Sequence, residues 1–214
     1  MKVLVICDDL WHPAEVIEKG LAAWGDPRFQ FDIVKAAKDI LTPERIAEYP
    51  VILCCKGDSV TSANNAPWFE DGVTEVRPAE FEEYVRAGGG FVSLHASNTA
   101  RAGSPMAAFV GNSFVGHPPR CGVDMEITAE HAVTAGVEPF HIRDEHYELA
   151  LCAPDAEVFL HSQSATGGRQ VAGYSRQMGE GRLCVLTPGH TLDVWLHPQF
   201  LRLLGNALAW CARA

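Results

Sequence analysis

Hydrophobic and polar positions follow two alternating patterns along the first third of the chain. Short apolar runs bounded by turn residues predict buried strands at residues 2–7, 29–34 and 51–55. Between the first two runs, Val16, Ile17, Leu21 and Trp24 recur at helical spacing after Pro13, which predicts a helix with one apolar face. A shorter helix is predicted to begin at Thr42-Pro43-Glu44, with Thr42 as its N-cap.

The same alternation continues through the next segment. Pro78 predicts the start of a helix whose inward face carries Phe81, Tyr84 and Val85 and which Gly88 closes. An apolar strand over 90–95 follows directly. Strand and helix thus alternate repeatedly, which is typical of a parallel, doubly wound sheet.

The pattern changes in the second half of the chain. We predict a helix or an Ala/Gly-rich loop over 97–110 and a long helix over 198–211. Runs at 123–128, 140–143 and 157–163 predict further strands, and those at 170–176 and 182–186, joined by 178–181, predict a hairpin. Residues 56–77 show no periodicity and predict a long loop, which either covers the site edge of the sheet or is a solvated insertion.

Composition narrows the class of protein. The chain has 214 residues, of which 47% are hydrophobic and 21% charged, and we expect one globular α/β domain over 1–214. Its formal net charge of −10 disfavours nucleic acid as a partner. No apolar run long enough for a membrane span and no signal-peptide pattern occur, so we expect no membrane association and a cytoplasmic location. The seven scattered cysteines are expected to be mostly buried, reduced thiols.

The segment Gly88-Gly89-Gly90-Phe91-Val92-Ser93-Leu94-His95-Ala96-Ser97 carries the first sign of function. A glycine-rich turn, a buried strand and a sharp turn bearing a reactive residue resemble the nucleophile elbow of class I glutamine amidotransferase-like domains. Those domains have cysteine where this chain has His95. Because a thiolate attacks the glutamine carbonyl in that chemistry, we expect no glutaminase activity. No G-x-S-x-G, Walker loop or G-x-G-x-x-G is present.

Further segments, in order along the chain, resemble the ThuA-like family, named for trehalose utilisation, within that superfamily. They are Phe114-Val115-Gly116-His117-Pro118, His131 to Gly136, Asp144-Glu145-His146-Tyr147, and Gly181-Arg182 followed by Thr187-Pro188-Gly189-His190. The resemblance implies a flavodoxin-like three-layer α/β sandwich with a mainly parallel sheet and extra antiparallel strands in the C-terminal half. It also implies a role in carbohydrate utilisation, with a trehalose-like or oxidised disaccharide as substrate class.

Polar residues that follow predicted strands are the candidate site, because the carboxyl ends of parallel strands share one edge of a sheet. As general acid and base we predict His95 and Glu145, and as substrate-binding residues His12, His117, Tyr147 and His190. Three of these histidines also have a purely structural interpretation: His95 can bond to backbone, His117 can be an exposed loop residue, and His12 can cap a helix. Glu145 competes with Asp144 and His146 for the inward direction, since alternate strand residues face opposite sides.

A divalent metal (zinc, manganese or iron) held by His95, His117 and His190 is the second interpretation of these residues, because imidazole is a common metal ligand. The spacing matches no local metal motif, so acid–base and metal-assisted chemistry both stay open. Three tryptophans lie in or near the loops that carry these candidate site residues, and they could stack on a sugar or anchor the core: Trp11, Trp68 and Trp195. A hydrolase-like or lyase-like sugar enzyme is the leading hypothesis. The alternative is a non-catalytic small-molecule-binding or regulatory module on the same fold, and a homodimer is an open expectation.

Overall fold

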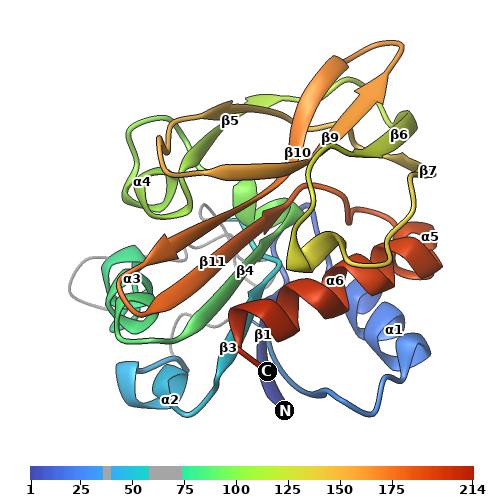
Figure 1. Cartoon of the computed structure of the whole chain (residues 1–214). Coiled ribbons are helices and arrows are strands. Elements are labelled where there is room, and N and C mark those ends of the chain that lie inside the picture. The colour runs from blue at the N-terminus through green and yellow to red at the C-terminus, as the bar shows by residue number, and fades with distance from the viewer. Residues whose placement is uncertain (36–39, 58–73) are drawn as a thin grey trace.

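A mixed nine-stranded sheet forms the centre of the protein, as a computed structural model of the chain shows (Figure 1). The structure describes residues 1–35, 40–57 and 74–214. The strand order across the sheet is β2-β1-β3-β4-β11-β10-β9-β6-β7. A separate two-stranded sheet pairs β5 with β8.

The first five strands of that order run parallel to one another. Their bounds are β1 Lys2–Cys7, β2 Gln30–Lys35, β3 Val51–Cys54, β4 Gly90–Leu94 and β11 Gly181–Leu186. Strands β1, β3 and β4 are buried at almost every position, as expected of strands covered on both faces. Their carboxyl ends therefore lie side by side at one edge of the sheet.

The other four strands of the sheet are antiparallel to their neighbours. They are β10 Gly168–Met178, β9 Glu157–Ser164, β6 Cys121–Ile127 and β7 Phe140–Asp144. The small sheet consists of β5 Asn112–Gly116 and β8 Glu148–Leu151. Asn112 ties it to the main sheet, because its Nδ2 donates to the Tyr174 hydroxyl of β10 at 2.7 Å.

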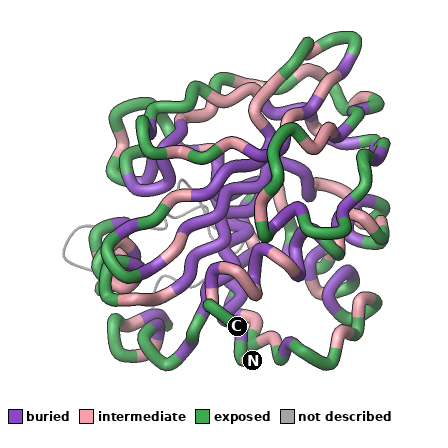
Figure 2. The backbone as a smooth tube through the Cα atoms, viewed as in Figure 1, coloured by how far each residue is buried: buried purple, intermediate pink, exposed green. Residues whose placement is uncertain are grey.

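Helices cover both faces of the parallel part of the sheet. The helices are α1 Ala14–Trp24, α2 Pro43–Ala47, α3 Pro78–Arg86, α4 Pro105–Val110, α5 Leu192–Trp195 and α6 Pro198–Cys211, with 3₁₀ turns η2 His95–Asn98 and η3 Ala132–Thr134. Alternate residues of β1 divide the core: Val3 and Val5 pack with α1, α5 and α6, whereas Leu4 and Ile6 pack with α2, α3 and α4. Figure 2 shows the central parallel strands buried between these layers, with exposed residues in the loops and on the outer sides of the helices.

Most of the predicted elements are confirmed with small shifts at their ends. Thr42 caps α2 by accepting from the Arg45 amide at 3.2 Å, and the hairpin of β10 and β11 has the expected antiparallel register. The strand predicted over 90–95 ends one residue early, because His95 turns the chain with a φ of 45° and begins η2. Strands β5 and β8 and helix α5 were not predicted.

Residues 58–73, most of the predicted loop over 56–77, lie outside the described residues, and Trp68 with them. None of the helices in the described parts of the chain combines the length and the apolar character that crossing a bilayer requires. All seven cysteines are free thiols, and Cys7, Cys54, Cys55, Cys184 and Cys211 are buried.

Candidate functional site

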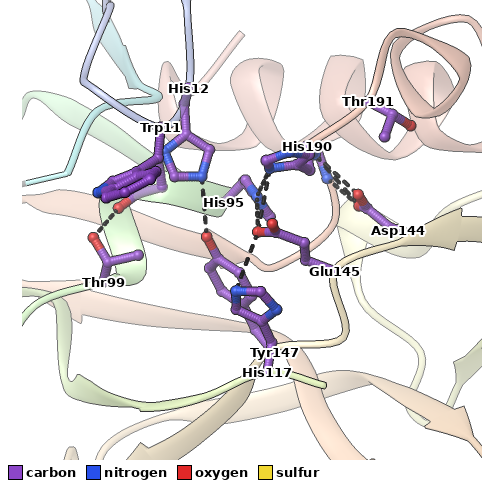
Figure 3. A network of polar contacts seen from close by, with 12 residues as sticks. Trp11, His12, His95, Thr99, His117, Asp144, Glu145, Tyr147, His190 and Thr191 are labelled. Atoms are coloured by element: carbon purple, nitrogen blue, oxygen red, sulfur yellow. Dashed lines mark hydrogen bonds and ion pairs between the residues drawn. The ribbon is translucent and has the colours of Figure 1, made fainter. Parts of the chain in front are cut away.

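Three histidines converge where parallel strands end. His12 follows β1, His95 follows β4 and His190 follows β11, so sheet topology brings together residues far apart in the chain. Figure 3 shows the three imidazoles pointing toward one another, with Glu145 and Tyr147 reaching them from the segment between β7 and β8.

His95 is held rigidly at the turn after β4. Its side chain is only 4% exposed, and its Nδ1 lies 2.7 Å from the Thr187 carbonyl oxygen. A carbonyl only accepts, so Nδ1 carries the hydrogen and Nε2 faces the site. Gly189 passes close by: a Cβ there would lie 3.1 Å from the His95 Cβ, at a φ of 145° that favours glycine.

Glu145 is the common neighbour of the imidazoles. Its Oε2 lies 3.2 Å from His190 Nδ1, 3.4 Å from His95 Nε2 and 3.7 Å from His117 Nε2. Burial opposes ionisation of Glu145, but the bonds to His190 and His95 outweigh it and lower the pKa of the carboxyl well below its ordinary value. Burial likewise opposes charging of His95, yet Glu145 and Asp144 together raise the pKa of its imidazole.

His12 is oriented by Asp9, the residue that follows β1 by two positions. The Nδ1 of His12 lies 2.8 Å from Asp9 Oδ1, while the amides of Trp11, His12 and Gly57 donate to the same carboxylate. Burial and the nearby histidines outweigh the effect of Asp9 and lower the pKa of His12. The neutral imidazole thus has its hydrogen on Nδ1 and a free lone pair on Nε2.

Tyr147 packs at the centre of the group. Its ring, 1% exposed, stacks on His95 with centroids 4.3 Å apart and lies between His95 and His117. Its hydroxyl lies 3.3 Å from His12 Nε2, the free acceptor of that imidazole, and so donates to it. Burial and the carboxylates of Glu145 and Asp144 raise the pKa of Tyr147 well above its ordinary value, so the phenol keeps its proton.

A cavity of about 660 Å³ opens above these side chains. Its lining includes all of the predicted substrate-binding residues together with Glu145: His12, His117, Glu145, Tyr147 and His190. His95 lies beneath, within reach of Glu145 and His190 but outside the cavity wall. The lining also contains Trp11, for which the sequence left open stacking on a sugar or anchoring the core, and six residues that were not predicted as site residues: Asp9, Gly57, Thr99, Arg101, Phe114 and Arg120.

The alternation that placed Glu145 and Tyr147 on one side explains why their neighbours lie elsewhere. His146 is buried on the other side, between the hydroxyls of Ser162 and Ser164 at 2.8 and 2.7 Å. Asp144, at the end of β7, accepts from the amides of Gly189 and His190 and so fixes the loop that carries His190. Trp195 is a core residue, 1% exposed, whose indole donates to the Gly189 carbonyl at 2.8 Å.

Four of these side chains bring potential metal-ligating atoms close together. His12, His95, His190 and Glu145 each offer one ligand atom, and the four atoms lie within 4.8 Å of one another. His117, which the sequence placed in the metal set, is not among the four; its side chain is 33% exposed and its Nδ1 lies 2.8 Å from the Pro118 carbonyl.

The sequence and the fold both resemble known proteins. The family model described as trehalose utilisation, ThuA, matches residues 2–211. No curated protein matches the sequence significantly.

Solved structures with the same fold cover nearly the whole chain. A putative ThuA-like protein from Bacteroides uniformis is 22% identical with a TM-score of 0.74, over 99% of this chain and 91% of that one. One from Parabacteroides merdae is 16% identical with a TM-score of 0.77, over 99% and 90%. A cytoplasmic protein from Salmonella typhimurium is 16% identical with a TM-score of 0.68, over 99% of each chain.

Proposed function

The chain belongs to the ThuA, or trehalose utilisation, family, and from that premise we propose that it binds and transforms a sugar by chemistry centred on a divalent metal ion held by His12, His95, His190 and Glu145. The substrate class is a trehalose-like or oxidised disaccharide. The observation that carries the proposal is the cluster of four ligand atoms directly beneath a cavity large enough for a sugar.

The distances within the cluster support a metal. The atoms of His95, His190 and Glu145 form a triangle with sides of 3.2, 3.3 and 3.4 Å. Ligands of tetrahedral zinc, at bond lengths of about 2.0–2.1 Å, are separated by about 3.4 Å. The triangle therefore has the dimensions of one face of such a site, and His12, whose ligand atom lies within 4.8 Å of the other three, would be the fourth ligand.

The hydrogen bonds around the cluster support the same conclusion. Asp9 holds the Nδ1 hydrogen of His12, and the Thr187 carbonyl holds that of His95, so Nε2 is the ring nitrogen through which each would bind an ion, in place of its present contact with Tyr147 or Glu145. Carboxylate and carbonyl partners of this kind are typical of metal-ligating histidines. Both strand ends are also strained, since Asp8 and His95 have φ values of 80° and 45°.

In this proposal the remaining side chains handle the substrate. An ion in the cluster would polarise a carbonyl or hydroxyl oxygen of the sugar. His117 presents a free Nε2 at the cavity wall, because its Nδ1 hydrogen bonds to the Pro118 carbonyl, and it would accept or return a proton. Tyr147 would donate a hydrogen bond. If no ion binds, the His95–Glu145 pair itself takes the acid–base role.

Fold and setting agree with this proposal. The order β2-β1-β3-β4-β11 with helices on both faces is that of flavodoxin-like sandwiches, in which ligands bind beyond the carboxyl ends of the strands. One structural relative is named as a cytoplasmic protein, which supports a cytoplasmic setting for the reaction.

The test is metal binding followed by turnover. Chelator-stripped protein is titrated with zinc, manganese and iron(II), and we expect one ion per chain for the wild type. His190→Ala and Glu145→Gln should lower the affinity at least a hundredfold, whereas His141→Ala, on the exposed side of β7, should not change it. Binding that survives His190→Ala would overturn the ligand assignment.

Turnover separates an enzyme from a binding module. Trehalose and its oxidised derivatives are incubated with metal-loaded wild type and with His117→Ala. Product from the wild type alone supports catalysis, and sugar binding without product supports the non-catalytic module.

A further inference from the structure

Two arginines in the cavity lining have no role in the metal cluster. Arg101 lies in the loop after η2, and Arg120 lies in the loop between β5 and β6. Both are exposed, and within the described parts of the chain no carboxylate lies within ion-pair distance of either. By contrast, Arg28, Arg86 and Arg176 each pair with a carboxylate.

The buried end of the cavity, its floor, therefore carries a negative charge, and the exposed end, its mouth, carries positive charge. The floor contains Tyr147 and Glu145, 1% and 14% exposed, and the Glu145 charge faces imidazoles. The mouth carries the two arginines beside Trp11, whose side chain is largely in solvent at 71% exposure. Among the described residues, Arg101 and Arg120 place two positive charges without ion pairs at one opening of a chain whose net charge is −10, and this favours a negatively charged ligand there.

We propose that this mouth recognises an anionic substituent, a carboxylate or a phosphoryl group, on the sugar that the cavity takes. The guanidinium group is planar and presents several donors in a fork that matches such oxyanions. The indole of Trp11 would pack against the sugar ring between the anion and the cluster. That the ligand is a sugar rests on the proposed function. The inference narrows this substrate class to acidic sugars.

Matched pairs of probes test the charge alone. Methyl β-glucuronide differs from methyl β-glucoside only in the carboxylate, and glucose 6-phosphate differs from glucose only in the phosphoryl group. We expect metal-loaded wild-type protein to bind the anionic member of at least one pair tenfold or more tightly in calorimetric titrations. The pair that shows the preference identifies the anion.

Substitution of the arginines then locates the preference. In Arg101→Gln/Arg120→Gln the two members of the pair should bind within twofold of each other, with the affinity for the neutral member unchanged. Arg143→Gln is the matched control, since Arg143 is exposed on β7, lies outside the cavity and has no ion pair among the described residues.

Three results would overturn the proposal: equal binding of charged and neutral members by the wild type, a preference that survives the double substitution, or no binding of any probe. Its failure is distinguishable from failure of the metal site. The arginine variants should keep one ion per chain, and His190→Ala should lose the ion while retaining the preference for the anionic probe.

Discussion

The tautomers of His12 and His95 are determined by two groups outside the cluster of four candidate ligands, the Asp9 carboxylate and the Thr187 carbonyl. Asp9 accepts from four groups, the His12 imidazole and the amides of Trp11, His12 and Gly57, and is 3% exposed. Burial would raise the pKa of Asp9, but the bond to His12 and the backbone amides more than compensate and lower it. Asp9 is thus an ionised carboxylate positioned to hold the His12 hydrogen on Nδ1.

Asp9→Asn should therefore weaken metal binding without removing a ligand. The amide can still accept from the backbone, but it loses the charge that supports His12. Loss of such an outer partner typically lowers metal affinity by about 10–100-fold. Asp26→Asn, which removes an exposed carboxylate paired with Arg28, is the control. An unchanged zinc affinity in Asp9→Asn, measured by competition with a chromogenic chelator, would show that His12 is not a ligand.

Sequence patterns identify the ligands more readily than their supports. His95 stands directly after the apolar strand β4, and His190 follows β11 through the turn that contains Gly189, so their position at the sheet edge could be predicted. Asp9 also follows a strand, but it is one of two adjacent aspartates, and sequence does not say which turns inward. Arg101 and Arg120 lie in loops without periodicity, and only the three-dimensional structure places both at one opening.

At the scale of elements, η3 depends on an imidazole in its neutral form. The His131 Nδ1 accepts from the Val133 amide at 3.1 Å, its Nε2 lies 3.2 Å from the Ser175 hydroxyl, and its ring stacks on Phe159. Burial lowers the pKa of His131, and nearby Glu157 and Arg182 act in opposite directions on it. The folded protein thus binds a proton at this site less readily than the unfolded chain.

It follows that acid should destabilise the protein through His131. The stability contribution is complete above the ordinary histidine pKa of about 6.5 and is lost as the pH falls below it, toward the lower pKa of the folded state. His131→Asn keeps a capping side chain that does not titrate, so the fall in melting temperature between pH 7.5 and 5.5 should be smaller than in the wild type. An unaltered fall in His131→Asn would contradict the capping role.

Strands could be predicted from the sequence where their residues alternate between buried and exposed or are all buried. Strand β7 alternates strictly between buried and exposed residues, and β3 is entirely buried, so periodicity found both. Strand β8 has two half-buried residues followed by two exposed ones, a pattern with no period. Its partner β5 is secured by Asn112 on Tyr174, a contact between residues 62 positions apart that no local pattern contains.

At the scale of the whole molecule, one core joins the parallel and antiparallel halves of the sheet. A single cluster of buried residues contains Val3 and Val5 of β1, Leu203 and Leu204 of α6, and Leu160 of β9. The four candidate ligands of the proposed metal site likewise come from loops after β1, β4 and β11 and from the segment after β7. The site therefore depends on both halves being folded together.

Leu160→Ala tests whether the two halves unfold as one unit. Leu160 is fully buried, and the truncation should cost about 2–5 kcal/mol through lost contacts and a residual cavity. Because the core is continuous, the loss should lower one shared transition, with far-UV circular dichroism and tryptophan fluorescence, to which Trp24, Trp195 and Trp210 of the helices contribute, giving the same midpoint in urea. Leu151→Ala, at a position 38% exposed on β8, should shift that midpoint little. Separate midpoints for the two signals in Leu160→Ala would mean that the antiparallel half unfolds independently. Because Glu145 follows β7, a chain with that half unfolded should lose metal binding before its parallel strands unfold.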